Sequence, residues 1–395
     1  MLIVINILKK MFNFLILLCF SFAVGKTIVA QYHNLFKGNL IKLNIGTPSQ
    51  FLFSKMTLRY NVSYLTANSF NIKTSSSLIS SSSPHKMTID DIVKNVTDIK
   101  ETFMFGDGNI TIENFPLRYI EDYRDISTER LSFGLSYEDL HFSLVHVLFE
   151  KKLIDRKQFG FSAQDPQSGK GLIFFGSPLS NMTNRKTKAT IPVNRNEEGW
   201  SSQISSLEMS YQNGSSITYT SKSTKVIFDI DENTIYVPVS FMKYLKETIF
   251  KDLIAEHYCT FNSRFDNKDD EFNIECLCSA MSYLPTFTFV FNSVGLSLHP
   301  SQLFEEAFGR CYFLFESSKQ YKDVWVLQSP FVNQFTTVFD YDAKEISFYS
   351  ATNVEVYKAL HSKIARSNVL LCNIFIMFIT NCLLGYVKVK FVYNY

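Results

Sequence analysis

The hydrophobic and polar positions along the chain follow strand-like patterns over most of its length. Residues 41–45 alternate between apolar and polar side chains, which is the period of a strand with one buried face. Residues 286–291 are β-branched or aromatic throughout and favour extended backbone. The best helical pattern is residues 240–249, where Ser240 stands in a capping position ahead of apolar residues at helical spacing. The sequence therefore predicts a mainly β protein with few helices.

Composition and charge narrow the possible function classes. With 395 residues and 46% hydrophobic content, the chain is long enough to bury two cores. A formal net charge of +2 gives no strong attraction to nucleic acid, and the sequence has neither a glycine-rich phosphate loop nor a basic stripe. We therefore expect no nucleic-acid partner. The serine-rich stretch at 75–83 is of low complexity, which predicts a solvated loop.

An apolar run near the N-terminus bears on the compartment. Lys9 and Lys10 precede apolar residues 11–24, and small residues close the run, which is the layout of a secretory signal peptide over residues 1–25. An uncleaved anchor is the alternative. The signal peptide predicts a protein of the secretory pathway, in the extracellular space or a lysosome-like lumen.

Five Asn-X-Ser/Thr sequences are acceptors for N-glycosylation, a modification that requires a secretory lumen. They begin at Asn61, Asn95, Asn109, Asn181 and Asn213. Any single one could arise by chance, but the set agrees with the signal peptide. The chain is therefore expected to be a glycoprotein.

A second apolar run, at residues 369–387, is close to the roughly 20 residues that span a bilayer. Two lysines follow it, which suits a cytoplasmic end and a single-pass type I membrane protein. Asn373 and Asn381 oppose a span, because each would place an amide in hydrocarbon. A glycolipid-anchor signal is the alternative, although a basic tail fits it poorly. We expect the membrane to be a partner through this segment.

The seven cysteines fall into two groups. Three lie in the terminal apolar runs, namely Cys19, Cys372 and Cys382. The other four are Cys259, Cys276, Cys278 and Cys311. An even set in an oxidising compartment favours disulfides. A zinc site is the alternative, but the single residue between Cys276 and Cys278 is tighter than the two-residue gap usual in such sites.

Several segments together carry a resemblance to a known family. Residues 40–50 read Leu-Ile-Lys-Leu-Asn-Ile-Gly-Thr-Pro-Ser-Gln and resemble the first hairpin of the pepsin-like aspartic proteases. Further stretches that resemble strands of this family follow in the expected order at residues 153–155, 158–161, 171–176, 284–289 and 325–340. The resemblance covers nearly everything between Asn39 and Tyr349. It implies a bilobal pepsin-like fold with two β-rich lobes, an interlobe cleft and no cofactor or metal.

The resemblance also implies how the chain is divided. The expected parts are a signal peptide at 1–25, an N-terminal lobe at 26–190, a C-terminal lobe at 191–350, a juxtamembrane linker at 351–368, a possible transmembrane helix at 369–387 and a short tail at 388–395. Cys278 and Cys311 stand where the family pairs two cysteines in its C-terminal lobe. Cys259 and Cys276 then remain as a second pair, which would close a polar loop.

Pepsin-like enzymes hold two carboxylates close enough to share one proton, so that one activates water while the other donates to the substrate carbonyl. By the resemblance, Asp229 matches the aspartate of the C-terminal lobe, and Thr57 stands where the N-terminal lobe should supply the other. A threonine hydroxyl can hold a water, yet its pKa is far too high for a base at ordinary pH. Asp229 is therefore expected to titrate as a lone acid.

The residues that support this site in the family are altered as well. Leu58 and Ile230 stand in place of the paired threonines that brace the two loops. Arg59 and Asp231 stand in place of glycines that let the backbone approach the carboxylates closely. We expect Leu58 and Ile230 to meet at the lobe junction as an apolar contact. Asp231 is interpreted as a solvated turn acid.

Three functions from different classes remain open. The favoured one is a non-catalytic pepsin-fold protein that binds a peptide or protein partner in the interlobe cleft. The second is an aspartic endopeptidase of weak or unusual activity through Asp229. The third is a membrane-tethered structural or adhesive glycoprotein. Activity that depends on Asp229 would select the second, and loss of binding on mutation of the cleft would separate the first from the third.

Overall fold

The computed structural model describes residues 26–35, 38–59, 63–67, 69–80, 82–89, 92–105, 110–121, 131–136, 143–162, 170–178, 188–194, 199–220, 224–263 and 272–349. The predicted signal peptide and everything after Tyr349, including the apolar run at 369–387, lie outside these ranges. So do three predicted glycosylation sites, Asn61, Asn109 and Asn181. Within the described ranges, none of the helices has the length and apolar character needed to span a bilayer.

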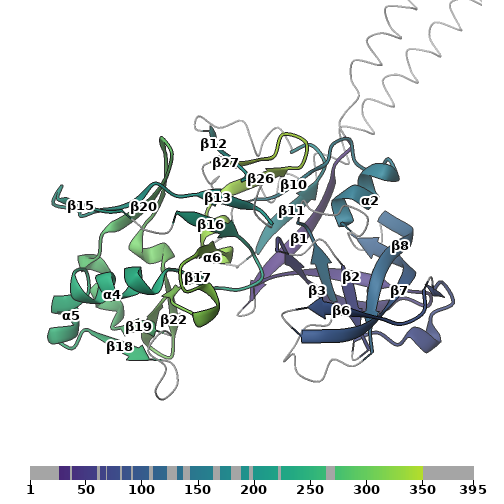
Figure 1. The fold of residues 1–395 in the computed structure, drawn as a ribbon, viewed down its shortest axis with the longest axis horizontal. Helices are drawn as coiled ribbons and strands as arrows, with labels where there is room; N and C mark the ends of the chain where they lie inside the picture. The colour runs from purple at the N-terminus through teal and green to yellow at the C-terminus, as the bar shows by residue number, and fades with distance from the viewer. Residues whose placement is uncertain are drawn as a thin grey trace, which may run out of the picture. The chain divides into compact units, whose positions relative to one another are not determined.

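A fourteen-stranded sheet dominates the fold (Figure 1). Its strands are β1 (Ile28–Leu35), β2 (Gly38–Ile45), β3 (Gln50–Thr57), β4 (Tyr64–Thr66), β5 (Ile79–Ser80), β6 (His85–Ile89), β7 (Ile92–Phe105), β8 (Ile110–Ile120), β9 (Leu131–Gly134), β10 (Gln158–Phe161), β11 (Lys170–Phe175), β12 (Lys188–Pro192), β26 (Thr336–Asp340) and β27 (Glu345–Tyr349). The order is β12-β27-β26-β10-β11-β1-β2-β3-β9-β4-β8-β7-β5, with β6 paired to β7. Strands from both halves of the chain therefore share one sheet.

Three smaller sheets are built from the second half of the chain. The first contains β13 (Ser201–Gln203), β16 (Lys225–Phe228), β25 (Trp325–Leu327), β17 (Ile235–Tyr236) and β24 (Phe315–Glu316). The second contains β15 (Ser216–Tyr219), β14 (Ser206–Ser210), β20 (Thr286–Phe291) and β21 (Val294–Leu298). The third contains β18 (Cys259–Ser263), β19 (Phe272–Cys276), β23 (Arg310–Phe313) and β22 (Phe304–Ala307).

Helices are few and short among the described residues. The α-helices are α2 (Leu144–Glu150), α4 (Val239–Glu247), α5 (Lys251–Ala255) and α6 (Ser329–Val332). The 3-10 helices are η1 (Ile72–Thr74), η3 (Cys278–Tyr283), η4 (Pro300–Gln302) and η5 (Lys319–Tyr321). The mainly β fold that the sequence predicts is thus confirmed.

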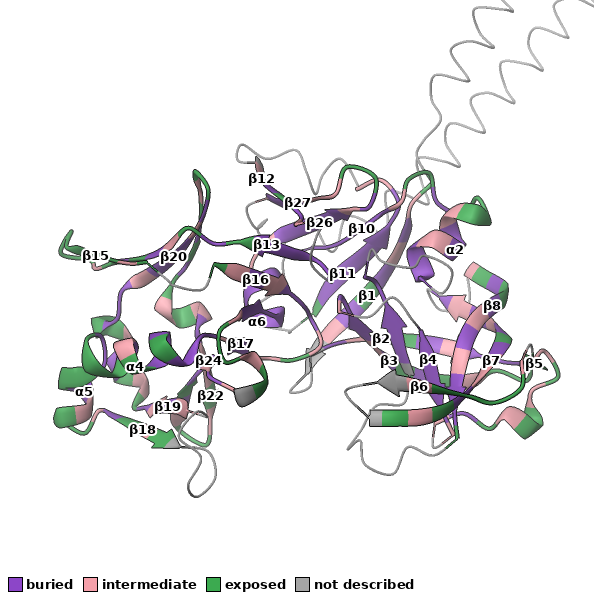
Figure 2. Ribbon diagram, in the orientation of Figure 1, coloured by how far each residue is buried: buried purple, intermediate pink, exposed green. Residues whose placement is uncertain are grey.

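Antiparallel pairing joins the two halves of the chain inside the large sheet. β10 pairs with β26 so that Phe159 lies opposite Phe339, and their rings stack with centroids 4.8 Å apart. Trp200 packs edge-on against Phe339 at 5.0 Å. Figure 2 shows β10 and β11 almost wholly buried, whereas α4 and α5 each have an exposed face. Apolar burial at this pairing therefore contributes to the attraction between the halves.

All the described residues belong to one compact unit. The expected lobe boundary between residues 190 and 191 falls inside β12, which pairs with β27. Buried hydrophobic residues of both halves belong to one continuous core, which runs from Ile28 to Phe348.

The predicted strands have the burial that their patterns require. In β2, Ile41, Leu43 and Ile45 are buried, whereas Lys42 between them is exposed. β20 covers the predicted residues 286–291 and buries alternate residues, all of them phenylalanine.

The predicted helix is present, but it begins before the predicted cap, Ser240. α4 begins at Val239, one residue before Ser240, and Pro238 is the residue that precedes it. The Pro238 carbonyl accepts from the backbone N–H groups of Phe241 and Met242, at 2.9 and 3.1 Å. Ser240 instead lies within the first turn, where it is exposed and its hydroxyl is 3.4 Å from that of Tyr219.

The serine-rich stretch is only in part the solvated loop that low complexity predicts. Ser75 Oγ accepts from the Thr47 N–H at 3.1 Å, and the Ser76 N–H donates to the Thr47 carbonyl at 2.6 Å. Ser77 donates to the buried carboxylate of Glu101. Gly46 makes this docking possible, since its φ is +81° and a Cβ there would lie 2.9 Å from Ser75 Oγ. The stretch therefore holds the turn between β2 and β3.

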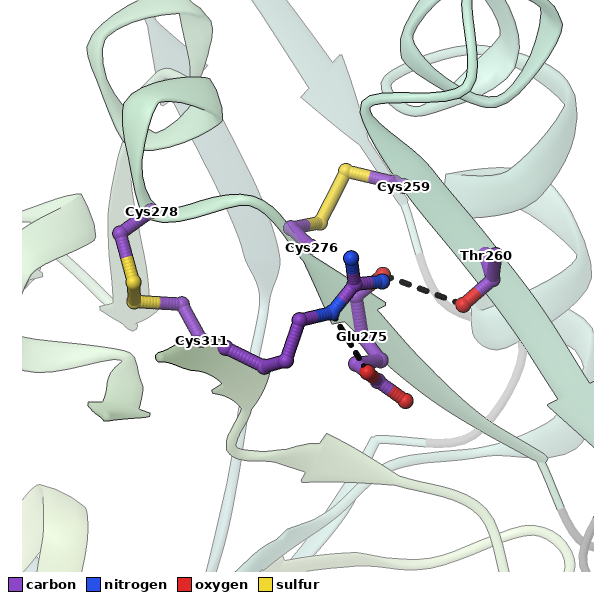
Figure 3. Close-up of a disulfide and its surroundings, with 7 residues drawn as sticks. Cys259, Thr260, Glu275, Cys276, Cys278 and Cys311 are labelled. Atoms are coloured by element: carbon purple, nitrogen blue, oxygen red, sulfur yellow. Dashed lines mark hydrogen bonds and ion pairs between the residues drawn. A yellow bond between two sulfur atoms is a disulfide. The ribbon is translucent and has the colours of Figure 1, made fainter. Parts of the chain in front are cut away.

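Two disulfides cross-link strands of the third small sheet and the 3-10 helix η3 beside it (Figure 3). Cys259 and Cys276 lie directly opposite each other on β18 and β19 and are bonded, with Cα atoms 4.0 Å apart. Cys278 is bonded to Cys311, with Cα atoms 5.1 Å apart. These are the pairs that the resemblance implies, and they occupy all four cysteines considered for zinc. Such links stabilise the fold mainly by restricting the unfolded chain.

Candidate functional site

Thr57 is placed by the end of strand β3. The strand runs antiparallel to β2 and parallel to β9, with Thr57 opposite Gly134. The Leu135 N–H donates to the Thr57 carbonyl at 2.9 Å and extends this pairing to the last residue of the strand. Thr57 is 3% exposed, so its hydroxyl points into a nearly water-free environment.

Asp229 is placed in the same way from the second half of the chain. It follows β16, which runs parallel to β25, and its N–H donates to the Leu327 carbonyl at 3.1 Å. Its side chain is 1% exposed. Two strand ends that are far apart in sequence therefore bring Thr57 and Asp229 together.

The hydrogen bonds at Asp229 tie the two halves to each other. Its Oδ1 accepts from the backbone N–H groups of Leu58 and Ile230, each at 2.9 Å. Thr57 Oγ1 lies 3.4 Å from the same oxygen and accepts from the Arg59 N–H at 3.2 Å. The site therefore contains one carboxylate facing one hydroxyl, at the two positions named from the sequence. We refer to these atoms as the Asp229 clasp.

The electrostatic environment of Asp229 opposes its ionisation. Burial raises its pKa above the ordinary value, because the charged form loses its hydration. The positive charge of Arg59 and the two backbone N–H donors lower the pKa of Asp229, since they stabilise the carboxylate. The negative charge of Glu232 acts in the direction of burial and raises the pKa of Asp229.

Asp231 is not the solvated turn acid that the sequence suggested. It is half-buried, and burial raises its pKa well above the ordinary value. The charges of Asp229 and Glu232 raise the pKa of Asp231 further, whereas those of Lys55 and Arg59 lower it. The prediction that Asp229 titrates as a lone acid is therefore wrong, because the charge of Asp229 raises the pKa of Asp231.

The junction around Asp229 holds a polar brace that sequence reasoning missed. The side-chain amides of Asn39 and Asn333 exchange two hydrogen bonds of 2.9 Å, and both residues are buried. The Asn39 N–H also donates to the Ile230 carbonyl at 3.3 Å, and Ser329 Oγ donates to the same carbonyl at 2.7 Å. Asn39 and Asn333 stand 294 positions apart, and no local pattern pairs them.

Leu58 and Ile230 are fully buried members of one core cluster, and their direct contact stays a prediction. The sequence predicts an apolar contact in place of the threonine brace, but the junction also contains polar contacts. Backbone groups of both residues take part in the Asp229 clasp or its supports.

Arg59 reaches an aromatic surface of the second half of the chain. Its guanidinium carbon lies 5.0 Å from the centroid of the Tyr321 ring, and that ring packs against Tyr236 at 5.0 Å. Tyr236 donates to Glu232 Oε2 at 2.8 Å, and Gln328 Nε2 donates to the same oxygen at 3.2 Å. We call Tyr321, Tyr236 and Glu232 the Tyr321 wall. The sequence marked Arg59 only as a lost glycine, and nothing in it pointed to these partners.

The two predicted glycosylation sites that the structure describes lie on the surface. Asn95 and Asn213 are exposed, on β7 and in the turn between β14 and β15. Asn213 Oδ1 accepts from the N–H of Ser215 at 2.9 Å and from its hydroxyl at 2.7 Å.

Comparisons with known proteins show which family the chain resembles. The family model described as eukaryotic aspartyl protease matches residues 40–351. Cathepsin E of Aquarana catesbeiana is 24% identical over 226 residues, an alignment that covers 54% of this chain and 51% of that relative. The chain thus spans about half the length of this curated relative.

Proposed function

The chain belongs to the eukaryotic aspartyl protease family, and from that premise we propose that it is a member without peptidase turnover. In this proposal it binds a peptide or protein partner in the cleft that the family fold implies between its lobes. The observation that carries the proposal is the Thr57 hydroxyl, which lies 3.4 Å from Asp229 Oδ1 at the position where the family resemblance implies a second carboxylate.

The chemistry of hydrolysis supports this reading. Peptide hydrolysis by the family needs one group that takes a proton from water and another that gives one to the substrate carbonyl. Thr57 can orient a water by hydrogen bonding, but it stays protonated at any pH at which the protein folds. The residue that faces Asp229 from the first half of the chain therefore supplies no base.

Asp229 has a structural role that is independent of catalysis. Its Oδ1 satisfies the N–H groups of Leu58 and Ile230, both of which belong to fully buried residues. A buried N–H group without a hydrogen-bond partner lowers the stability of the folded protein. These loops therefore need an acceptor at this position whether or not the protein hydrolyses a substrate.

The compartment is part of the proposal. Two disulfides are typical of proteins that fold in an oxidising lumen, and the signal-peptide layout and the five sequons agree with it. We place the protein in the secretory pathway, as a glycoprotein held at the membrane by residues 369–387.

A weak endopeptidase is the second candidate, and Asp231 is the observation that favours it. Burial and the charge of Asp229 raise the pKa of Asp231, so a second acid of the site interacts with the first. In this candidate Asp229 would act as the general base, and a protonated Asp231 would act as the general acid if the substrate carbonyl came within its reach.

The test is hydrolysis of a denatured protein by the purified full-length chain from acid to neutral pH. Asp229→Asn, Asp231→Asn and a transition-state-analogue inhibitor of the family are the controls. We expect no cleavage by folded protein, together with retention of peptides from a random pool on the immobilised protein. Cleavage that is lost in Asp229→Asn and with the inhibitor would establish the second candidate, and loss in Asp231→Asn would name the other acid. No cleavage and no retained peptide would favour a structural or adhesive glycoprotein.

A further inference from the structure

The contact between Arg59 and the Tyr321 wall connects the loop after β3 to the second half of the chain. The guanidinium carbon lies 5.0 Å from the Tyr321 ring centroid, a distance at which the face of the ring attracts a cation. Neither Arg59 nor Tyr321 is buried; both are partly exposed. A cation that arrived from solvent could therefore reach the same ring.

The wall is held in place by its own contacts. Tyr321 and Tyr236 pack with ring centroids 5.0 Å apart. Glu232 is fixed by the Tyr236 hydroxyl at 2.8 Å and by Gln328, whose Nε2 donates to its carboxylate and whose Oε1 accepts from its N–H, both at 3.2 Å. Gln328 is 2% exposed, so it is a rigid support. An aromatic face and a carboxylate are thus arranged before any partner arrives.

The charges around the wall favour a cation. The charge of Glu232 raises the pKa of Asp229 and the pKa of Asp231, and the charge of Arg59 lowers both. Glu232 and Arg59 therefore act on the same two acids, with opposite sign. Removal of Arg59 from the ring would leave the acids with less compensation, unless another cation took its place.

We propose that the Tyr321 wall is a subsite for the guanidinium or ammonium group of a basic residue in the bound peptide or protein, and that Arg59 occupies it in the free protein. This inference rests on the proposed function and specifies its ligand class. An arriving basic residue displaces Arg59 and takes over both the ring contact and the compensation of the acids. Arg59 is then an internal competitor, which lowers the apparent affinity of the wild-type protein for basic ligands.

The probe is N-acetyl-L-argininamide, with N-acetyl-L-citrullinamide as its uncharged isostere, titrated by ligand-observed NMR against the full-length protein. The variants are Arg59→Ala, which vacates the wall, and Arg59→Ala combined with Tyr321→Leu or with Glu232→Gln. Lys246→Ala is the matched control, because it removes a similar contact 4.7 Å over the Phe261 ring, elsewhere on the surface. Thermal unfolding verifies that each variant is folded.

Arg59→Ala should bind argininamide with a Kd at least about fivefold lower than wild type, since the ring contact is released for the probe. Either second substitution should reverse that gain, and Lys246→Ala should behave as wild type. Citrullinamide should show no gain in any variant. Equal binding by wild type and folded Arg59→Ala, or an equal gain for citrullinamide, would overturn the subsite.

Failure of this inference is distinguishable from failure of the proposed function. Wild type could retain peptides that are not enriched in arginine or lysine, while Arg59→Ala binds argininamide no more tightly than wild type does. That result would support the proposed function and overturn the subsite. Alternatively, Arg59→Ala could bind argininamide more tightly than wild type does, while neither wild type nor Arg59→Ala retains peptides. That result would support the subsite and count against peptide binding.

Discussion

Replacement of Asp229 separates its role as a hydrogen-bond acceptor from its role as an acid. Asp229→Ala removes the oxygen that accepts from the Leu58 and Ile230 N–H groups, each now at 2.9 Å. A buried donor without a partner costs about 1–3 kcal/mol, so the loss of two partners should lower the free energy of unfolding by roughly 2–6 kcal/mol. Asp229→Asn retains a carbonyl oxygen at Oδ1 and should be far less destabilised at neutral pH, since it also avoids a buried charge.

The assay is equilibrium unfolding in urea, followed by the fluorescence of Trp200 and Trp325, both of which are fully buried. The disulfides are kept intact, so that only the clasp differs between the variants. Equal stability of Asp229→Ala and wild type would refute the clasp. Equal destabilisation by Ala and Asn would show that the charge of Asp229, rather than its acceptor oxygen, holds the loops.

Three further predictions follow from the site and its junction. Burial raises the pKa of Asp231 in the folded protein, so the folded state binds a proton more tightly than the unfolded state does. The free energy of unfolding should therefore fall as the pH rises from the ordinary pKa of 3.8 through the raised pKa of the folded protein. Urea unfolding at a series of pH values should show a smaller fall for Asp231→Asn than for wild type. Thr57→Asp alone should not give strong hydrolysis of a denatured protein, because Arg59 still stands where the family has glycine, and robust cleavage would contradict this. Asn39→Ala should cost about 1–3 kcal/mol by removing the two hydrogen bonds that the buried side-chain amides of Asn39 and Asn333 exchange, and a double variant in which Asn333→Ala is added should cost less than the sum of the two single variants.

Local patterns were enough to predict the fold class and many of its strands. The alternation at residues 41–45 and the β-branched and aromatic residues 286–291 describe which faces are buried, and both lie in strands with that burial. Local rules failed where tertiary contacts compete with them. Ser240 has the residue type of a cap, yet the helix begins at Val239 because the Pro238 carbonyl accepts the first N–H groups. The serines after residue 74 look solvated in sequence but bond to the turn at Thr47.

The sequence by itself determined which residues would face each other in the candidate site. Thr57 and Asp229 were named from segments whose order and spacing resemble a family, and the structure places them 3.4 Å apart across 172 positions. Residue type also settles that a hydroxyl is no base, since its pKa is a property of the group.

Only the tertiary structure decided how those residues are held and what surrounds them. The Asn39 and Asn333 pair, the Tyr321 wall around Arg59 and the influence of Asp229 on Asp231 all depend on burial or on distances between segments far apart in the chain. A periodic pattern reports which face of one element is buried, but it carries no information about which element packs against that face. Hydrogen-bond partners and shifted pKa values arise from that packing, and so they appear only once the chain has folded.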